Sequence, residues 1–143
     1  MNTNLGFCLA LHRAHASLQL KFDGELGIQH GISFNDFALL NLLAQAEGGR
    51  VSIPELVRPM GQPQSAGLRQ LILLEKIGLV VREGAKGDRQ AVLRPAGRAL
   101  VHVARETADS ICTEAVATIA PAVLATVSGA LVTLAKTTCY AQD

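Results

Sequence analysis

Apolar residues recur every three or four positions over much of this chain, a spacing that places them on one face of an α-helix. The first stripe predicts an amphipathic helix from Asn4 to Leu26, with Gly27 and a turn at Gly31 ending it. This helix is long for one that lies on the surface of a small domain. The positions of its apolar face are Leu5, Cys8, Leu11, Leu18, Phe22 and Leu26.

Two capping boxes predict the starts of the next helices. In this motif a Ser or Thr and an acidic or amide residue three positions later each bond the other's backbone N–H. Ser33-Phe34-Asn35-Asp36 has a related form, and Gly48-Gly49 ends the helix that it opens. Ser52-Ile53-Pro54-Glu55 opens a second, short helix. The predicted apolar positions are Phe37, Leu40 and Leu43 in the first helix, and Ile53, Leu56, Val57 and Met60 in the second.

A third helix and a hairpin follow. Pro63 suits the first turn of a helix and Gly78 suits its left-handed end, which predicts a helix from Pro63 to Ile77. The β-branched residues after Gly78, a turn at Gly84-Ala85-Lys86-Gly87-Asp88 and a second run from Arg89 to Arg94 predict a β-hairpin. A short helix, a turn, a second helix and a basic hairpin make the winged form of the helix-turn-helix, whose second helix enters the major groove of DNA.

The C-terminal part predicts two more helices, one from Pro95 to about Thr118 and a last one capped by Thr118 with Pro121 in its first turn. No charged residue occurs from Ala115 to Ala135, which is long enough to cross a membrane. The run is rich in Ala and Thr, contains Pro121 and Gly129, and lacks aromatic anchors, so we expect a protein interface instead. The fold class is therefore mostly α. We expect residues 33–94 to be the winged region of a single continuous domain, and residues 1–32 and 95–143 to be dimerisation helices.

The distribution of charge favours a nucleic-acid partner. The 143 residues carry a net charge of +1. Between Arg50 and Arg105, however, ten basic residues face four acidic ones, which gives this segment +6 and the remainder −5. A basic segment that coincides with the predicted helix and hairpin is typical of proteins that bind the phosphate backbone.

Several short motifs resemble the MarR family of winged helix-turn-helix transcription regulators. They are Gly31-Ile32-Ser33, Ser52-x-x-Glu55-Leu56, Ser65-x-x-Leu68-Arg69, Leu74-Glu75-Lys76-x-Gly78-Leu79-Val80, Gly87-Asp88-Arg89 and Leu93-x-Pro95-x-Gly97, within a resemblance from about Leu5 to Leu134. The resemblance implies a homodimer that binds pseudo-palindromic operators in double-stranded DNA, usually as a repressor. It also implies release by a small anionic or aromatic effector, or by cysteine oxidation. Two positions depart from the family pattern: Gln90 replaces the second arginine of the wing, and Arg94 replaces a threonine that would cap the next helix.

The candidate DNA contacts divide into two groups. Gln64, Ser65 and Arg69 lie in the first two turns of the predicted recognition helix, where amide and guanidinium groups can bond adenine and guanine. The second group, Arg82, Lys86 and Arg89, belongs to the predicted hairpin and matches family positions that touch the minor groove or its phosphates.

Other chemistry has weaker signals. No nucleophile motif, phosphate-binding glycine loop or C-x-x-C pair occurs, so we expect neither an enzyme nor a zinc site nor another cofactor. His12, Arg13 and His15 share the first helix and are candidates for an effector site, although histidines partly buried near the dimer seam are the simpler interpretation. Cys8 resembles in placement the sensing cysteine of peroxide-responsive family members, with Cys112 or Cys139 to resolve it. Cys8 has no cation close to it in sequence and lies in an apolar stripe, so a buried, inert thiol is the simpler interpretation.

Two alternatives to an effector-responsive DNA-binding regulator remain. Ala66, Gly67 and Leu68 make the recognition helix unusually apolar, which is compatible with a winged-helix protein-interaction module that binds little or no DNA. An oxidation-sensing regulator based on Cys8 is the other alternative. No signal segment with a basic start and an apolar core opens the sequence, so we expect a cytoplasmic location.

Overall fold

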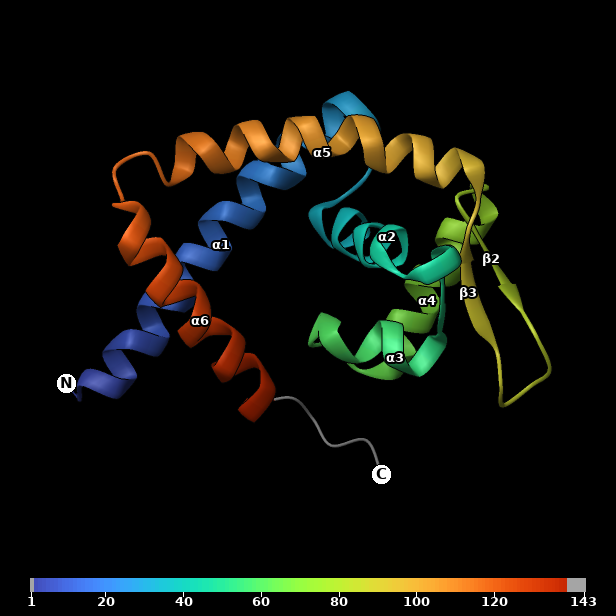
Figure 1. The fold of residues 1–143 in the computed structure, drawn as a ribbon, viewed down its shortest axis with the longest axis horizontal. Helices are drawn as coiled ribbons and strands as arrows, with labels where there is room; N and C mark the ends of the chain where they lie inside the picture. Colours follow the sequence, from blue (N-terminus) through green and yellow to red (C-terminus); the bar gives the residue numbers. More distant parts are fainter. Residues whose placement is uncertain (1, 139–143) are drawn as a thin grey trace.

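The computed structural model describes residues 2–138, which form helices around a small antiparallel sheet (Figure 1). A long helix, α5, lies along one edge of the molecule, and the winged region lies below one half of it. The elements in order are α1 (Thr3–His30), α2 (Phe34–Gln45), the 3-10 turn η1 (Glu47–Gly49), β1 (Arg50–Ser52), α3 (Ile53–Val57), the 3-10 turn η2 (Arg58–Met60), α4 (Gln64–Lys76), β2 (Val80–Glu83), β3 (Gln90–Leu93), α5 (Pro95–Ala115) and α6 (Pro121–Thr138).

The predicted start signals of α2 and α3 are confirmed. Ser33 Oγ accepts from the N–H of Asp36 at 3.0 Å, and Asp36 Oδ2 accepts from the N–H of Ser33 at 3.1 Å. Ser52 Oγ accepts from the N–H of Glu55 at 3.4 Å, but within residues 2–138 the Glu55 carboxylate makes no hydrogen bond in return, so only half of the predicted capping box forms at α3. Arg94 precedes α5 without a side-chain cap, as its replacement of threonine predicts.

Two predicted helix boundaries need correction, although the turn predicted at Gly31 is confirmed. Helix α1 continues through Gly27 and ends at Gly31, where φ is 71° and the N–H bonds the carbonyl of Gly27. A glycine inside a helix costs only about 1 kcal/mol, so the left-handed turn at Gly31, rather than Gly27, ends the helix. Thr118 does not cap α6, because the carbonyl of Ala120 accepts the first helical bonds, from Val123 and Leu124.

The sheet has the strand order β1-β3-β2, and both pairings are antiparallel. Arg50 pairs with Val92, and Glu83 with Gln90, so the side chains of Arg50, Glu83 and Gln90 share the outer face. Val80, Ala91 and Leu93 face inward and are buried. We call β2, β3 and the turn between them the wing; it projects away from α1 and α6 (Figure 1).

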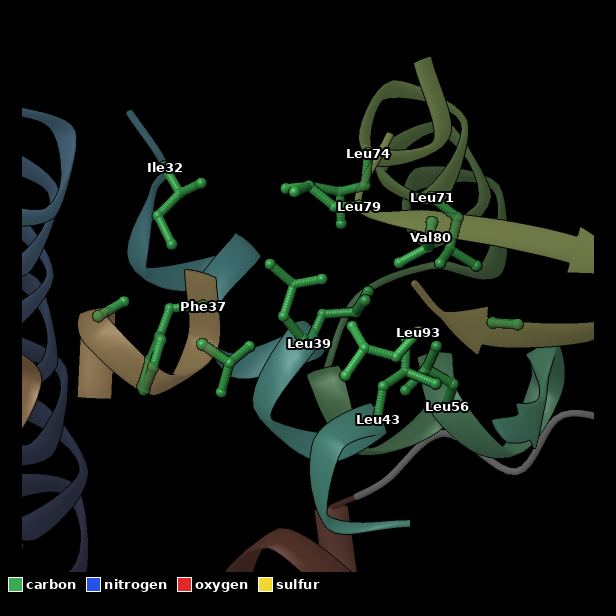
Figure 2. Packing of buried hydrophobic residues seen from close by; sticks show 14 of the residues in the cluster. Ile32, Phe37, Leu39, Leu43, Leu56, Leu71, Leu74, Leu79, Val80 and Leu93 are labelled. Atoms are coloured by element: carbon green, nitrogen blue, oxygen red, sulfur yellow. The ribbon is translucent and has the colours of Figure 1, made fainter. Parts of the chain in front are cut away.

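The hydrophobic core fills the space between α2, α3, α4 and the sheet (Figure 2). Leucines dominate it, and those of α2 and α4 are almost entirely removed from water. The end of α1 and one face of α5 complete it through Phe22, Leu26, Val101, Ala104, Ala108 and Ile111. The winged region is therefore packed against the helices that lead out of it.

The first half of α1 and the whole of α6, here called the arm, leave most of their apolar side chains exposed. None of the described residues of α6 is buried. The large apolar side chains of the arm that are at least 40% exposed are Leu5, Phe7, Leu9, Val123, Val127 and Val132. Burying such surface is favourable by about 25 cal/mol per Å², so the arm has the character of an association surface. By length and composition alone, α6 is also a helix that could cross a membrane.

Candidate nucleic-acid interface

The three candidate contacts on α4 lie on its exposed side. Gln64, Ser65 and Arg69 are exposed, and within residues 2–138 no hydrogen bond or ion pair occupies their side chains. They belong to the first two turns of α4, the part of a recognition helix that contacts base edges. Their donors and acceptors are therefore available to a ligand.

The apolar residues of α4 have a packing role. Gly67 is buried and lies against Val57 of α3, while Ala66 and Leu68 are half-buried. The small size of Gly67 therefore serves the crossing of α3 and α4, and the partial burial of Ala66 and Leu68 leaves the exposed side of the helix to its polar residues. Two other apolar residues of this helix and its end, Leu73 and Ile77, are 62% and 63% exposed.

A chain of hydrogen bonds fixes α4 against the start of α2. Gln70 Nε2 donates to Asp36 Oδ1 at 3.1 Å, and Gln62 Nε2 donates to Gln70 Oε1 at 3.0 Å. Asp36 also belongs to the capping box of α2. Arg69 is adjacent to this anchored residue, so its backbone is held in place while its side chain stays exposed.

Two of the three predicted wing cations are exposed. Lys86 lies in the turn of the hairpin and Arg89 immediately before β3, and no ion pair occupies either side chain among the described residues. The carbonyl of Arg89 accepts from the N–H of Ile53, which ties the base of the wing to the start of α3.

The third cation, Arg82, faces α4 instead of solvent. Its Nη2 and Nε lie 3.2 and 3.4 Å from Oε1 of Glu75 on α4, and its backbone N–H donates to Oε2 at 2.7 Å. These hydrogen bonds from Arg82 outweigh partial burial and hold the pKa of Glu75 below its usual value. The structure therefore places the Arg82 guanidinium between the wing and α4, where it is part of the fold.

A second polar group lies across the outer face of the sheet. Arg50 donates from Nη2 to Glu83 Oε2 at 3.2 Å and from Nη1 to Gln90 Oε1 at 3.0 Å. One guanidinium thus joins β1 to both strands of the wing. Gln90, which departs from the family pattern, is the acceptor in the middle.

The sequence pattern did not single out Arg50, Glu75 and Glu83 as parts of this site. The alternation of β2 was the signal that could have found them, because it places residues 82 and 83 on opposite faces of the sheet. A carboxylate is then expected near the inward-facing arginine, and a cation near the outward-facing glutamate.

Comparison with solved structures identifies this arrangement. A MarR family regulator from Rhodococcus sp. RHA1 superposes with a TM-score of 0.85 at 19% identity, over 98% of this chain and 99% of that one. Sco3205 of Streptomyces coelicolor, a MarR family regulator solved in complex with DNA, gives 0.83 at 20% identity over 95% and 88%. The chain has the MarR fold.

No protein-family model and no curated protein matches the chain by sequence. A third structure with the MarR fold, CouR of Rhodococcus jostii RHA1 bound to p-coumaroyl-CoA, gives a TM-score of 0.83 at 21% identity over 96% of this chain and 95% of that one. The fold thus occurs both in a protein solved with DNA and in one solved with a small molecule.

The MarR fold of this chain has a hollow of about 270 Å³ where α1 meets α5. Glu25, Gln29, Glu106, Thr107 and Ser110 line it. Its lining contains two carboxylates and no basic side chain, so it is unsuited to an anion. His12, Arg13 and His15 are all exposed on the first half of α1 and are not among the lining residues. The structure does not gather the predicted effector residues into this hollow.

The environment of Cys8 also differs from its prediction. Cys8, expected to be buried in the apolar stripe, is exposed in this chain because that half of α1 packs on no other element closely enough to cover it. Cys112 is exposed as a residue, but partial burial of its thiol raises the pKa, which lowers the reactive thiolate fraction. Cys139 lies outside the described residues.

Proposed function

We propose that this protein is a dimeric, cytoplasmic, DNA-binding transcription regulator of the MarR type, most simply a repressor, and not an enzyme. The observation that carries the proposal is the set of polar and basic side chains exposed on α4 and the wing: Gln64, Ser65, Arg69, Lys86 and Arg89. On a winged helix-turn-helix, these two elements are the ones that face the major groove and the adjacent backbone or minor groove.

The proposed mechanism requires two copies of the chain. Association through the arm places two recognition helices about one DNA turn, roughly 34 Å, apart on a pseudo-palindromic operator. An effector that favours a different separation shifts the population toward a dimer that does not fit the operator. His12, Arg13 and His15 remain proposed contacts for such an effector only if the partner subunit completes their surroundings.

The competing function is a winged-helix protein-interaction module. The exposure of Leu73 and Ile77, at 62% and 63%, favours it, because large apolar side chains on a recognition helix are suited to a protein surface. The exposure of Cys8 keeps a thiol-based oxidation sensor as a third candidate, but burial raises the pKa of Cys112, which disfavours that thiol as the resolving partner.

Salt dependence of DNA binding distinguishes the two functions. We expect the full chain to bind a mixed-sequence duplex, and the logarithm of the binding constant to fall linearly with the logarithm of the salt concentration. The slope should be about −0.9 for each phosphate contacted. Selection of genomic fragments by the immobilised protein should then enrich a pseudo-palindromic sequence. Absence of salt-dependent binding to any duplex would support the interaction module.

A further inference from the structure

Adjacent residues of β2 connect the wing to two different elements. Arg82 faces inward and bonds Glu75 of α4, whereas Glu83 faces outward and bonds Arg50 of β1. The strand is therefore tied on both faces. Since Lys86 and Arg89 are carried by the same hairpin, their positions relative to α4 depend on these ties.

The Glu75–Arg82 interaction on the inner face has the better-defined geometry of the two. Both oxygens of the Glu75 carboxylate are used, one by the backbone N–H of Arg82 and the other by its guanidinium. The side chains of Arg82 and Glu75 are 20% and 31% exposed, against 48% and 50% for Arg50 and Glu83. A partly buried, charge-assisted pair of this kind holds its geometry better than an exposed one.

We propose that Glu75 and Arg82 are positioning residues for DNA binding. They hold the wing in a fixed orientation relative to the recognition helix and do not contact DNA themselves. The inference rests on the proposed function. Its physical basis is preorganisation: a wing already fixed in the bound geometry loses less conformational freedom when Lys86 and Arg89 engage the backbone.

Replacement of Glu75 by Gln separates this role from a direct contact by Arg82. If Arg82 contacted phosphate, Glu75 would compete with DNA for its guanidinium, and Glu75→Gln would strengthen binding by freeing Arg82 and removing a negative charge. If the pair positions the wing, the same change weakens binding even though it removes that charge. The two roles predict opposite signs.

The experiment measures binding of the full chain to a fluorescent mixed-sequence duplex, long enough to span both recognition helices, at two salt concentrations. We expect Glu75→Gln to lower the affinity by about two- to fivefold for each protomer in contact. Glu55→Gln is the matched control, because Glu55 is exposed on α3 and its carboxylate has no hydrogen bond or ion pair within residues 2–138. This control should leave the affinity unchanged or slightly higher.

A second background tests whether the effect passes through the wing. In a chain that already carries Lys86→Ala and Arg89→Ala, Glu75→Gln should no longer weaken binding, because there are no wing cations left to position. Should Glu75→Gln unfold the chain, Arg82→Lys replaces it. Lysine keeps the charge, so a direct contact predicts little change in affinity, whereas a positioning role predicts a loss.

Unchanged or higher affinity in Glu75→Gln, or an equal loss in the background without wing cations, would overturn the inference while leaving DNA binding intact. If the unaltered chain shows no salt-dependent binding, the proposed function itself fails. The two failures are thus distinguished by the unaltered chain alone.

Discussion

Gly67 of α4 lies so close to Val57 of α3 that a Cβ on the glycine would meet both valine methyl groups, 2.8 Å from Cγ2. Non-bonded carbon atoms normally stay about 3.5–4.0 Å apart. Only a residue without a side chain therefore fits at this crossing of the helix-turn-helix. The geometry of the recognition helix depends on a residue that cannot itself contact DNA.

We expect Gly67→Ala to destabilise the fold by about 1–3 kcal/mol, the usual cost of overpacking a core. The control is Gly24→Ala on α1, where an added Cβ meets nothing within 4 Å. This change should stabilise the chain by about 0.5–1 kcal/mol, because alanine loses less backbone entropy in a helix. Urea unfolding followed by circular dichroism gives both values, and equal stabilities of the two variants would disprove the close packing of α3 on α4.

Gly67 also illustrates what the sequence reveals and what it conceals. Helix starts at Ser33 and Ser52 were predictable because a capping box is local, needing residues only three apart. Gly67 is buried because its face of α4 meets α3. Its apolar character therefore removes nothing from the DNA-facing side. The sequence pattern of α4 alone does not specify that face.

The partner of Arg82 could not be predicted for a different reason. The position of this arginine in a basic hairpin suggested a DNA contact, whereas alternation along β2 turns it toward Glu75. The hydrogen bond between them spans seven residues and a turn, so its geometry depends on how the hairpin leaves the helix. Cys8 and α6 show a third limit of prediction from sequence. Whether an apolar face is buried depends on the partner that covers it, and the sequence of one chain does not specify that partner.

Acidification should weaken the attachment of the wing to α4. Bonds from Arg82 lower the pKa of Glu75 below its ordinary value of 4.5, so the carboxylate contributes stability that is fully present above that value. The contribution is lost as the pH falls through the lowered pKa of the folded state. The measurement is the free energy of unfolding of the unaltered chain minus that of Glu75→Gln, as a function of pH. This difference should shrink only below about pH 4.5, and a constant difference down to about pH 2 would contradict the role given to the pair.

Association through the arm should be inseparable from folding. Val123, Val127 and Val132 of α6 are 50%, 43% and 56% exposed, and a helix with this apolar surface needs a partner in water. We expect a dimer whose unfolding temperature rises with protein concentration. Ending the chain at Thr118 removes this surface and should give insoluble or unfolded protein. A soluble, folded monomer from that truncation would show that the arm is not required.

The final prediction separates the two groups of arginines. Arg69 is exposed on the second turn of α4, so Arg69→Ala should cost about 1–3 kcal/mol on the selected operator and much less on scrambled DNA, relaxing specificity. Arg89 is exposed on the wing, so Arg89→Ala should weaken binding to both duplexes by similar factors. The slope of the logarithm of the binding constant against the logarithm of the salt concentration should also become shallower, by about one unit for each phosphate that the variant no longer neutralises.

Because a dimer uses each residue twice, each substitution removes two contacts from the complex. Both effects are measured for the intact dimer, on operator and scrambled duplexes at two salt concentrations. Equal losses on both sequences for Arg69→Ala would mean that α4 does not distinguish bases through that residue. Unchanged binding in both variants would remove α4 and the wing from the DNA interface. The exposed Leu73 and Ile77 would then become the basis for assigning the recognition helix to a protein partner, because they are the apolar groups that a protein surface would cover.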